Sequence, residues 1–582
     1  MHGWQGRDRF VVLASKWGSG EAFLATWQAW RDDARRCAHL VFIAIAPQAA
    51  GPGDSTAPLA SQLLAAWPPP TRNLHRLAFE DGAVELLLAV GDEMRAWLPQ
   101  LVATVDAFDL TGHAATPDLR LAKALGRLAA PGALLVADRH VAAWRTHLPS
   151  AGFASAADAG APDDRLRARF TPAFAPRHAP SRRPAAREDS TRRVLIVGAG
   201  LAGCAAAWAL AERGWHSTLL ERRDAPAAEA SGNPAGLFHG IVNAHDGLHA
   251  RFNRVAALAA RAAIRDAIDA GVPGDANGLL RLETTLAVDR MHDLLRRLAL
   301  PASYVHALTA DEASARAGIP LQHPAWFYPG GGWVQPAGLA RRFVARAGDR
   351  VTWRLQAEVQ RLERTPSGWC LRDADGAPLA EAANVVLANS ADALRLLGAA
   401  DWPIDMVRGQ ISLADATRVA TPSLPIAGHG YLLPAIDGEA MFGATAQAGD
   451  FDPAVRDADH IANLAQLARL TGRPVDIAPD ELRGRTAWRC SAADRLPLIG
   501  AVPELAPQGA RLEQPRHVPR QPGLFMFTAL GSRGITWSAL GARVLASWVT
   551  GAPAPVEASL LDALDPARFV SRRARRQRSN DG

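Results

Sequence analysis

A glycine-rich turn between an apolar strand and an alanine-rich helix constrains the fold of this chain most strongly. The run RVLIVGAGLAGCAAAWALAERGWHSTLLERR occupies residues 193–223, and its β-branched start, Val194–Val197, leads directly into the glycines. Gly198 permits a sharp turn, Gly200 lets the backbone approach a pyrophosphate, and Gly203 lets the helix pack closely on the strand. This order of elements predicts a Rossmann-type α/β domain that binds a dinucleotide.

An acidic residue follows the second predicted strand of this unit. The strand His216–Leu220 ends at Glu221, where a carboxylate can accept hydrogen bonds from both ribose hydroxyls. The N-terminus of the intervening helix offers unpaired N–H groups and a positive dipole end to the pyrophosphate. An acid at this position disfavours a 2′-phosphate and therefore NADP, but the fingerprint alone leaves FAD and NAD open.

Later segments favour a flavin. The small-residue loop Ala230–Gly236 would let backbone N–H groups approach an isoalloxazine, and Val385–Ala388 is typical of the short buried strand that returns beneath it. A strand predicted over Leu524–Leu530 precedes a helix from about Ile535 to Val549, whose N-terminus could stabilise negative charge on a reduced flavin. Besides the residues of the fingerprint, the expected cofactor-binding residues are Ser231, Gly232, Asn233, Gly531 and Gly534.

The length of the chain requires more than one domain. Its 582 residues exceed the roughly 250–300 at which one hydrophobic core stops growing. Predicted strands alternate with helical stretches over residues 1–153, and residues 154–192, rich in Pro, Ala and Arg, are predicted to be a linker. Residues 193–570 would form a cofactor domain with an inserted α+β substrate domain. The arginine-rich residues 571–582 are expected to be a solvated, poorly ordered tail.

Composition and charge exclude several classes of protein. Hydrophobic residues make up 48% of the chain and charged residues 21%, which excludes a disordered or fibrous protein. The strongly apolar stretch Leu40–Ala46 ends at Pro47, well short of the ~20 residues that cross a bilayer, so no membrane segment is expected. The first ten residues, MHGWQGRDRF, have no apolar signal core, which favours the cytoplasm.

The cysteines and the basic residues give two further expectations. The four cysteines are too scattered for a disulfide framework or a metal knuckle, so we expect buried thiols and no metal. The net charge is +6, and the basic residues are almost all arginines, since Lys16 and Lys123 are the only lysines. Arginine suits forked contacts to phosphate and carboxylate, so a polyanionic partner is permitted, although genomic base composition explains the bias equally well.

Seven segments after residue 192 resemble a known family. They are ASGNPAGLFHGIVNAHDGLHARF (230–252), GGWVQPAGLARRF (331–343), VRGQIS (407–412), GHGYLLPAIDG (428–438), FGATAQAGDFDPAVRDADHIANLAQL (442–467), RCSAADRLPLIGAVP (489–503) and LGSRGITWSALGARVLASWVTG (530–551). In this order they resemble the flavin-dependent amine oxidases of the D-amino-acid oxidase and glycine oxidase type. More closely, they resemble the bifunctional enzymes of 5-methylaminomethyl-2-thiouridine synthesis in transfer RNA.

The resemblance implies a reaction and three site residues. The implied reaction uses noncovalent FAD to oxidise 5-carboxymethylaminomethyl-2-thiouridine at the wobble position, releasing glyoxylate and leaving the aminomethyl nucleoside. Arg489 would hold the substrate carboxylate, with Arg533 as a second arginine, because a guanidinium fork matches a carboxylate. Gln410 would line the substrate side of the flavin, or it is simply a hydrogen-bonding residue at the end of a strand. The alternative function is oxidation of free glycine, sarcosine or D-amino acids.

The N-terminal residues resemble the other half of the same family. FVVLASKWGSGEAFLATWQAWR (10–31) is similar to the S-adenosylmethionine-binding start of its methyltransferase domain, which would methylate the product of the oxidation. Three positions depart from the family pattern. Lys16 stands in place of a glycine, Ala46 in place of a ribose-binding acid and Thr111 in place of the catalytic aspartate. We expect a Rossmann-like fold here, tRNA as the partner of the whole chain, and a monomer.

Overall fold

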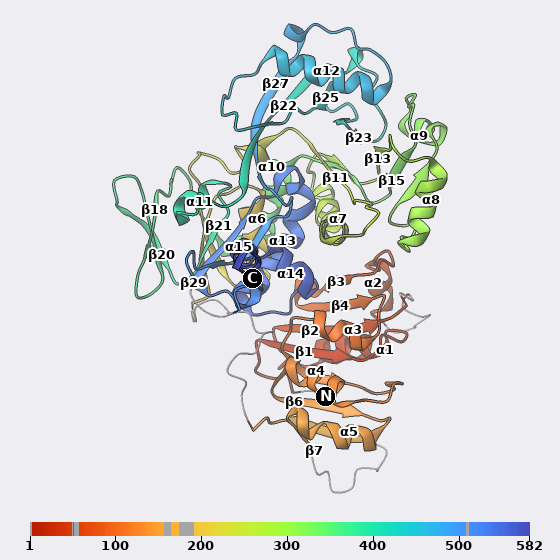
Figure 1. The fold of residues 1–582 in the computed structure, drawn as a ribbon, viewed down its shortest axis with the longest axis vertical. Helices are drawn as coiled ribbons and strands as arrows, with labels where there is room; N and C mark the ends of the chain where they lie inside the picture. Colours follow the sequence, from red (N-terminus) through yellow and green to blue (C-terminus); the bar gives the residue numbers. More distant parts are fainter. Residues whose placement is uncertain are drawn as a thin grey trace. The chain divides into compact units, whose positions relative to one another are not determined.

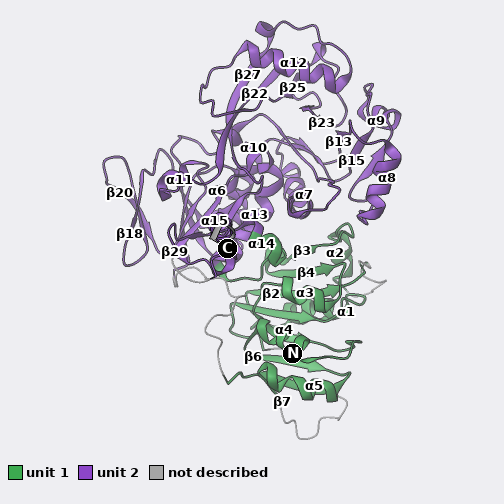
Figure 2. Ribbon diagram, in the orientation of Figure 1, with its two compact units in different colours: residues 1–184, 550–562 green, residues 185–549, 563–582 purple. Residues whose placement is uncertain are grey.

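The computed structural model describes residues 3–48, 51, 58–155, 165–173, 191–507 and 511–581 (Figure 1). The chain divides into two compact units, which Figure 2 shows in different colours. Unit 1 comprises Met1–Pro184 and Thr550–Asp562, and unit 2 comprises Ala185–Val549 and Ala563–Gly582. The first boundary falls within the linker region that the sequence predicts. The second divides the cofactor domain expected over 193–570, because the chain re-enters unit 1 for residues 550–562.

Unit 1 is built on one eight-stranded sheet with the order β3-β4-β2-β1-β5-β6-β8-β7. Its strands are β1 (Arg9–Ala14), β2 (His39–Ala46), β3 (Leu74–Phe79), β4 (Val84–Val90), β5 (Val105–Asp109), β6 (Ala129–Ala137), β7 (Phe153–Ser155) and β8 (Leu166–Phe170). Strands β4, β2, β1, β5 and β6 run parallel, and their apolar runs are buried, as in a Rossmann-like sheet. The helices are α1 (Glu21–Asp32), α2 (Ala60–Ala65), α3 (Met94–Trp97), α4 (Leu119–Leu128) and α5 (Val141–His147).

Strand β8 lies inside the stretch predicted to be a linker, so that prediction is wrong for residues 166–170. Leu166, Ala168 and Phe170 are buried and alternate with exposed arginines, which is the two-residue period of a strand with one covered face. The surrounding abundance of Ala, Arg and Pro hides this short alternation. The remaining linker residues 156–164 and 174–190 lie outside the described part of the chain.

Residues 550–562 are tied to the strands and loops of unit 1 by hydrogen bonds from a side chain and from the backbone. The guanidinium of Arg9 donates to the carbonyl oxygens of Thr550, at 3.4 Å, and Gly551, at 3.0 Å. The backbone N–H of Ala554 donates to the carbonyl of Val102 at 2.9 Å. The segment is therefore a structural part of unit 1, although it follows unit 2 in the sequence.

Unit 2 contains the cofactor sheet that the glycine-rich fingerprint predicts. Its order is β17-β10-β9-β21-β29-β28, and only β28 runs antiparallel to its neighbour. The strands are β9 (Arg193–Val197), β10 (His216–Leu220), β17 (Val351–Arg354), β21 (Val385–Leu387), β28 (Leu498–Pro503) and β29 (Arg520–Thr528). Helices α6 (Leu201–Ala211), α10 (Pro336–Ala347) and α13 (Gly534–Thr550) accompany the sheet, and α6 is buried from Leu201 to Leu210.

A nine-stranded sheet forms the substrate side of unit 2. Its order is β14-β15-β13-β23-β24-β25-β22-β26, and β27 pairs with β22. The strands are β13 (Leu279–Leu282), β14 (His306–Leu308), β15 (Ala325–Tyr328), β22 (Ile404–Asp415), β23 (Ile426–Gly428), β24 (Gly430–Leu432), β25 (Glu439–Gly443), β26 (Gln447–Ala448) and β27 (Arg483–Ala492). Helix α12 (Asp457–Thr471) lies beside β22, β25 and β27 at the top of Figure 1.

The other elements of unit 2 connect and cover these sheets. Strands β11 (Gly236–Phe238), β12 (Gly274–Asp275) and β16 (Gly332–Val334) form a small sheet. Strands β18 (Arg361–Arg364), β19 (Trp369–Arg372) and β20 (Pro378–Ala382) form another. The helices are α7 (Leu248–Asp269), α8 (Val288–Arg297), α9 (Ala310–Ala317), α11 (Asp392–Leu397) and α15 (Arg568–Asp581), while α14 (Ala558–Leu564) spans the end of the unit 1 segment. No helix in the described ranges is long and apolar enough to cross a bilayer.

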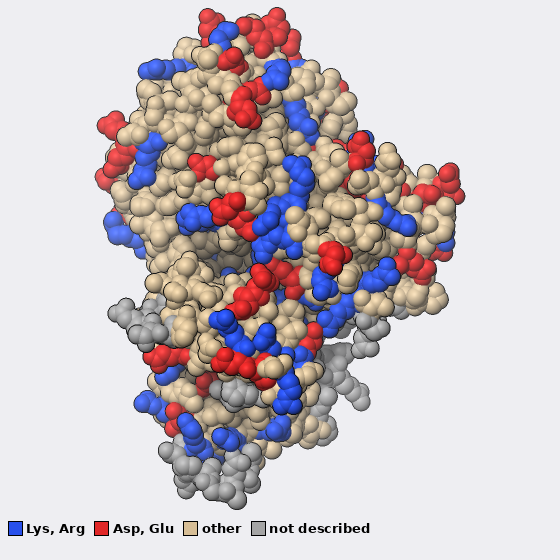
Figure 3. Space-filling model, turned by 180° about the vertical axis from the view of Figure 1, so that it is seen from behind, with Lys and Arg blue, Asp and Glu red and all other residues tan. Residues whose placement is uncertain are grey.

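The expectation of a poorly ordered basic tail is wrong, because residues 568–581 form helix α15. Its arginines pair with carboxylates of unit 2. Arg572 lies 2.6 Å from Asp494, and Arg578 lies 2.7 Å from Glu513. These pairs lower the charge available to a phosphate. Figure 3 shows the same mixing more widely, since acidic side chains lie between the basic ones on that face of the molecule.

Candidate active site

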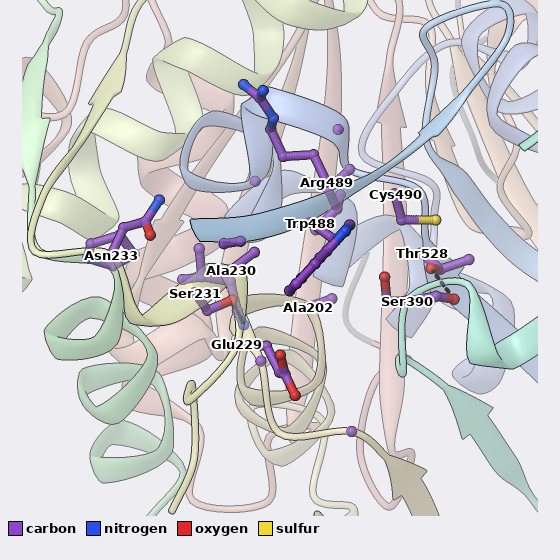
Figure 4. Close-up of a pocket in the computed structure, with 18 of the residues that line it drawn as sticks. Ala202, Glu229, Ala230, Ser231, Asn233, Ser390, Trp488, Arg489, Cys490 and Thr528 are labelled. Carbon is purple, nitrogen blue, oxygen red and sulfur yellow. Dashed lines mark hydrogen bonds between the residues drawn. The ribbon is translucent and has the colours of Figure 1, made fainter. Parts of the chain in front are cut away.

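A cavity of about 1010 Å³ lies between the cofactor sheet and the substrate sheet of unit 2. Its lining begins at Val197 and ends at Thr536, so unit 2 alone supplies it. Figure 4 shows side chains from the loop after β10, from β27 and from the ends of β21 and β29 converging on this space. The volume lies near the upper end of the range for ligand pockets, as a dinucleotide with its substrate would require.

The three glycines of the fingerprint have different structural roles. Gly198 has a φ of +97°, and a Cβ there would lie 2.8 Å from the carbonyl oxygen of Ala388. A Cβ on Gly203 would lie 1.9 Å from the carbonyl oxygen of Gly198, so this glycine lets α6 pack on the turn. Gly200 lines the cavity, and a Cβ there would meet only Ser231 Oγ, at 3.2 Å. The space beside Gly200 is therefore open to a ligand.

Ser231 and Glu221 complete the cradle at the start of α6. The backbone N–H of Leu201 donates to Ser231 Oγ at 3.1 Å, so a side chain from a distant loop caps this helix. Glu221 follows β10 and lines the cavity, and its carboxylate accepts hydrogen bonds from the backbone N–H groups of Ala199, at 2.8 Å, and Arg223, at 3.0 Å. The carboxylate is thus held in a fixed position where it can accept bonds from ribose hydroxyls.

The small-residue loop after β10 is fastened to β27 by Arg485. Arg485 Nη2 donates to the carbonyl oxygens of Ala228, at 2.9 Å, and Glu229, at 2.8 Å, while its Nε donates to Asn233 Oδ1 at 3.2 Å. Gly232 does not line the cavity, but a Cβ there would lie 2.8 Å from Arg485 Nη2. Arg485 is not among the residues predicted from the sequence. Its spacing of four residues from Arg489 could have indicated that the two side chains lie on the same face of one strand.

Arg489 lies on β27 and lines the cavity, as predicted (Figure 4). Its Nη2 donates to the carbonyl oxygen of Thr445 at 2.6 Å, and no carboxylate of the described residues pairs with it. Burial lowers the pKa of Arg489, and the phenol of Tyr431 acts in the opposite direction. A Cβ on Gly409 would lie 2.5 Å from Arg489 Nη2, so the glycine makes room for the guanidinium.

Arg533 lines the same cavity from the turn that begins α13. Burial and, to a smaller extent, the positive charge of Arg281 lower the pKa of Arg533 to about 10, while Tyr328 acts in the opposite direction. Neither Arg533 nor Arg281 pairs with a carboxylate within the described ranges of the chain. Arg281 lies on β13 and belongs to no motif, so the sequence does not indicate it. Gly531 and Gly534, near Arg533 in the sequence, also line the cavity.

A neutral histidine borders this cationic group. His239 lines the cavity, and burial together with Arg533 and Arg281 lowers its pKa to about 3. Its Nδ1 bonds to the carbonyl oxygen of Gly240, which makes Nδ1 the protonated nitrogen. The imidazole ring lies 5.4 Å from the ring of Tyr328, measured between centroids. The uncharged ring therefore adds no further positive charge to the site at neutral pH.

The prediction that Gln410 lines the substrate side of the flavin is wrong. Gly409 and Ile411 on β22 line the cavity, and the alternation of a strand turns Gln410 to the other face. There Gln410 is fully buried, its Nε2 donates to the carbonyl of Arg456 at 2.9 Å, and its Oε1 accepts from the N–H of Arg456 at 2.8 Å. It is a structural hydrogen-bonding residue, the second of the two interpretations that the sequence allows.

Cys490 also lines the cavity, beside Ser390 and Thr528 in Figure 4. Burial raises the pKa of the Cys490 thiol, and a thiol that stays protonated is a weak nucleophile. Thr528 Oγ1 donates to the carbonyl oxygen of Ser390 at 2.8 Å. All four cysteines are buried and free, as predicted. Within the described residues, no group of His, Cys, Asp and Glu could hold a metal ion.

The three unusual positions of unit 1 lie near the carboxyl ends of its parallel strands. Ala46 ends β2, and Thr111 follows β5, where both its backbone N–H, at 3.0 Å, and its hydroxyl, at 2.6 Å, donate to Asp109 Oδ1. Lys16 follows β1, and its Nζ lies 2.2 Å from the place that a Cβ on Gly112 would take. This edge is where doubly wound sheets bind their ligands.

Comparisons with known proteins agree with the fold of unit 2. The family model described as DAO, FAD dependent oxidoreductase, matches residues 193–548. L-proline dehydrogenase from P. horikoshii has a TM-score of 0.52 and 16% identity, covering 66% of this chain and 98% of its own. Glycine oxidase from Bacillus cereus has a TM-score of 0.50 and 20% identity, covering 62% of this chain and 95% of its own. At these identities the structures establish the fold alone.

Two curated relatives match both units. The tRNA 5-methylaminomethyl-2-thiouridine biosynthesis bifunctional protein MnmC of Methylibium petroleiphilum is 46% identical over 601 residues, which cover 97% of this chain and 91% of that protein. The protein of the same name from Burkholderia multivorans is 40% identical over 605 residues, covering 98% of this chain and 91% of its own.

Proposed function

Since this chain belongs to the MnmC family of bifunctional tRNA-modifying proteins, we propose that the cavity of unit 2 is where the wobble side chain of tRNA loses its carboxymethyl group. The family combines an FAD-dependent oxidoreductase with a methyltransferase in the biosynthesis of 5-methylaminomethyl-2-thiouridine. The substrate of the oxidation step would be 5-carboxymethylaminomethyl-2-thiouridine. The observation that carries this proposal is Arg489, a cavity-lining guanidinium with no carboxylate partner among the described residues.

The residues around the fingerprint fit noncovalent FAD. Gly200 leaves open space for a pyrophosphate beside the start of α6, and Glu221 is positioned to hold the adenosine ribose. Gly531 and Gly534 also line the cavity at the start of α13. A Cβ on Gly534 would lie 3.6 Å from the side chain of Leu201, so α13 and α6 begin close together. When bound, FAD would supply the oxidant for the glycyl carbon next to the substrate amine.

Arg489 would hold the glycyl carboxylate of the substrate. The carbonyl of Thr445 accepts one of its N–H groups and fixes the side chain, which leaves the remaining donors for an anion. Arg533 adds a second positive charge to the lining, and Arg281 is close enough to interact with it electrostatically. These charges have a further effect on the substrate, because they disfavour protonation of the nearby secondary amine. Hydride loss requires this amine to be neutral, so the same residues bind the acid and activate the amine.

The proposal can be tested with tRNA that carries the carboxymethylaminomethyl group. Mixed with the purified protein without oxygen, this tRNA should bleach the oxidised-flavin absorbance, and mass spectrometry of its nucleosides should show the aminomethyl product. Persistence of the carboxymethyl group would refute the proposal. Flavin reduction by free glycine, sarcosine or D-amino acids, with none by tRNA, would establish the alternative amino-acid oxidase instead.

Substitution of Arg489 tests its role separately. Arg489→Ala should keep the flavin and lower kcat/KM for the tRNA by roughly 30- to 1000-fold, as expected when one partner of a buried charged pair is removed. Arg483→Ala, at an exposed arginine on the same strand, is the matched control. Loss of the flavin in Arg489→Ala would show that this residue supports the cofactor rather than the substrate.

We also propose that the protein acts as a monomer in the cytoplasm. Residues of both the cofactor sheet and the substrate sheet of this chain line the cavity, which supports a monomer. Sedimentation at enzyme concentrations used in the assay tests the monomer, and fractionation of cells tests the compartment. A stable dimer, or activity confined to the membrane fraction, would contradict these proposals.

A further inference from the structure

A phenylalanine at the cavity is exposed far more than its chemistry favours. Phe451 lies between β26 and α12 and lines the cavity, yet 68% of its surface is open to solvent. No other large apolar side chain in the described ranges is more exposed. Burial of an apolar side chain lowers the free energy. An exposed phenylalanine ring beside a ligand cavity therefore indicates a surface that is covered during function.

The segment that carries Phe451 is held firmly in place. Arg456 bridges two carboxylates of the segment, with 2.6 Å to Asp450 and 2.7 Å to Asp452. Arg408 is fully buried and its Nε donates to the carbonyl of Asp452 at 2.7 Å. The exposure of Phe451 is therefore a fixed property of this segment.

Trp488 links this segment to the substrate-binding strand. Its indole N–H donates to the carbonyl of Asp450 at 2.7 Å, and the ring itself lines the cavity next to Arg489 in the sequence (Figure 4). The same strand thus positions the guanidinium that would bind the carboxylate and supports the segment that presents Phe451. The aromatic ring and the cationic group are parts of one preorganised surface.

We propose that Phe451 stacks against the pyrimidine ring of the modified nucleotide at the mouth of the cavity. This inference rests on the proposed function, in which Arg489 holds the far end of the substrate arm and the base points outward. A flat, apolar ring is suited to the face of a nucleobase, and stacking of this kind is a common means of holding an unpaired base. The two acidic residues beside Phe451 are paired with Arg456, which lessens their repulsion of an RNA strand.

Three variants and three ligands test the proposal in the full-length flavoprotein. Phe451→Ala removes the ring, Phe451→Trp keeps an aromatic surface, and Ile461→Ala removes a similarly exposed apolar side chain outside the cavity lining, on α12. The ligands are the modified tRNA, the free nucleoside 5-carboxymethylaminomethyl-2-thiouridine, and N-methylglycine (sarcosine), which has the carboxylate and the amine without the base. KM and kcat are measured for the first two, and a dissociation constant for N-methylglycine from the flavin spectrum.

Phe451→Ala should raise KM for the tRNA and the nucleoside by roughly 5- to 100-fold with little change in kcat, since stacking is present before and during the reaction. Phe451→Trp and Ile461→Ala should stay within about 3-fold of the unsubstituted protein, and N-methylglycine should bind all four proteins equally. The proposal is overturned if Phe451→Ala leaves both KM values unchanged. It is also overturned if the substitution raises the dissociation constant of N-methylglycine by the same factor as the two KM values. Failure of the proposed function looks different, because the unsubstituted protein would then not act on the tRNA.

Discussion

At the residue scale, the position of Arg489 depends on the absence of a side chain on the neighbouring strand. Gly409 is opposite Ala487 in the β22–β27 pair and is therefore a diagonal neighbour of Arg489. A Cβ on Gly409 would lie 2.5 Å from the guanidinium. Arg489 is predictable from its motif, but no local signal in the sequence identifies Gly409 as the residue that makes room for the guanidinium. Arg281 and Phe451 likewise have no local signal, because the role of each depends on contacts that are distant in sequence.

Gly409→Ala should therefore displace Arg489 without affecting the cofactor. We expect kcat/KM for the tRNA to fall by about 10-fold or more while the flavin content stays normal, because the guanidinium must move to admit the methyl group. The measurement is steady-state kinetics with the flavin spectrum as reference. Gly247→Ala is the control, because a Cβ at Gly247 would have no atom within 4 Å. Normal kinetics in Gly409→Ala would contradict this account.

Gly200 tests the cofactor in the same way. Gly200→Val should give a folded but colourless protein, because a Cβ at Gly200 would meet only Ser231 Oγ, at 3.2 Å, and the side chain beyond it would occupy the pyrophosphate space. Circular dichroism checks the fold and the visible spectrum checks the flavin. A yellow Gly200→Val protein would show that the cofactor lies elsewhere.

His239 makes the stability of unit 2 depend on pH. Its pKa is lowered from 6.5 to about 3 in the folded protein, so below about pH 6.5 the unfolded chain binds a proton that the folded protein does not. Stability is therefore lost as the pH falls through this window. Between pH 7 and pH 5 we expect His239 to account for about 1–2 kcal/mol of this loss.

His239→Asn keeps a donor for the Gly240 carbonyl but cannot be protonated. Denaturant unfolding at pH 7 and pH 5 should show a smaller loss of stability for this variant than for the unsubstituted protein. His245→Asn, at an exposed histidine, should leave the loss unchanged. An identical pH dependence in His239→Asn would rule out this residue as a source of the effect.

At the element scale, the sequence predicts elements well where a local pattern and a tertiary requirement coincide. Strand β9 and helix α6 follow from the apolar run and the glycines, and α13 begins at Gly534, one residue before its predicted start. Strand β8 and helix α15 were missed because arginines dominate their composition and their partners lie far along the chain. Ion pairs to Asp494 and Glu513 hold α15, and no local sequence signal indicates them.

The close packing of α6 on its turn gives a prediction at this scale. Gly203→Ala would place a methyl group 1.9 Å from the carbonyl oxygen of Gly198. Because this oxygen belongs to the backbone, it cannot move aside as the end of a flexible side chain could. The helix must move away from the turn, so we expect about 1–3 kcal/mol of destabilisation together with weaker flavin binding. Thermal unfolding and flavin content measure the two effects. A Gly203→Ala protein of normal stability and colour would contradict the packing role.

At the scale of the whole molecule, the division into two units predicts separable unfolding. The cavity proposed for the flavin is lined by residues of unit 2 alone, so excess FAD should stabilise that unit by about 2.7 kcal/mol at 100 times the dissociation constant. Differential scanning calorimetry should resolve two transitions, of which only one moves with FAD concentration. A single transition that shifts as a whole would show that the units unfold together.

The return of residues 550–562 into unit 1 has a consequence for attempts to separate the two activities. A protease that nicks the backbone once between the units would leave two fragments that still co-purify, because the larger fragment carries a piece of the smaller fragment's fold. A gene truncated after the first 184 codons would lack that piece, leaving Arg9 and Val102 without the hydrogen-bonding groups described above. An independent N-terminal enzyme would have to be designed with the missing peptide supplied in trans or grafted to its end.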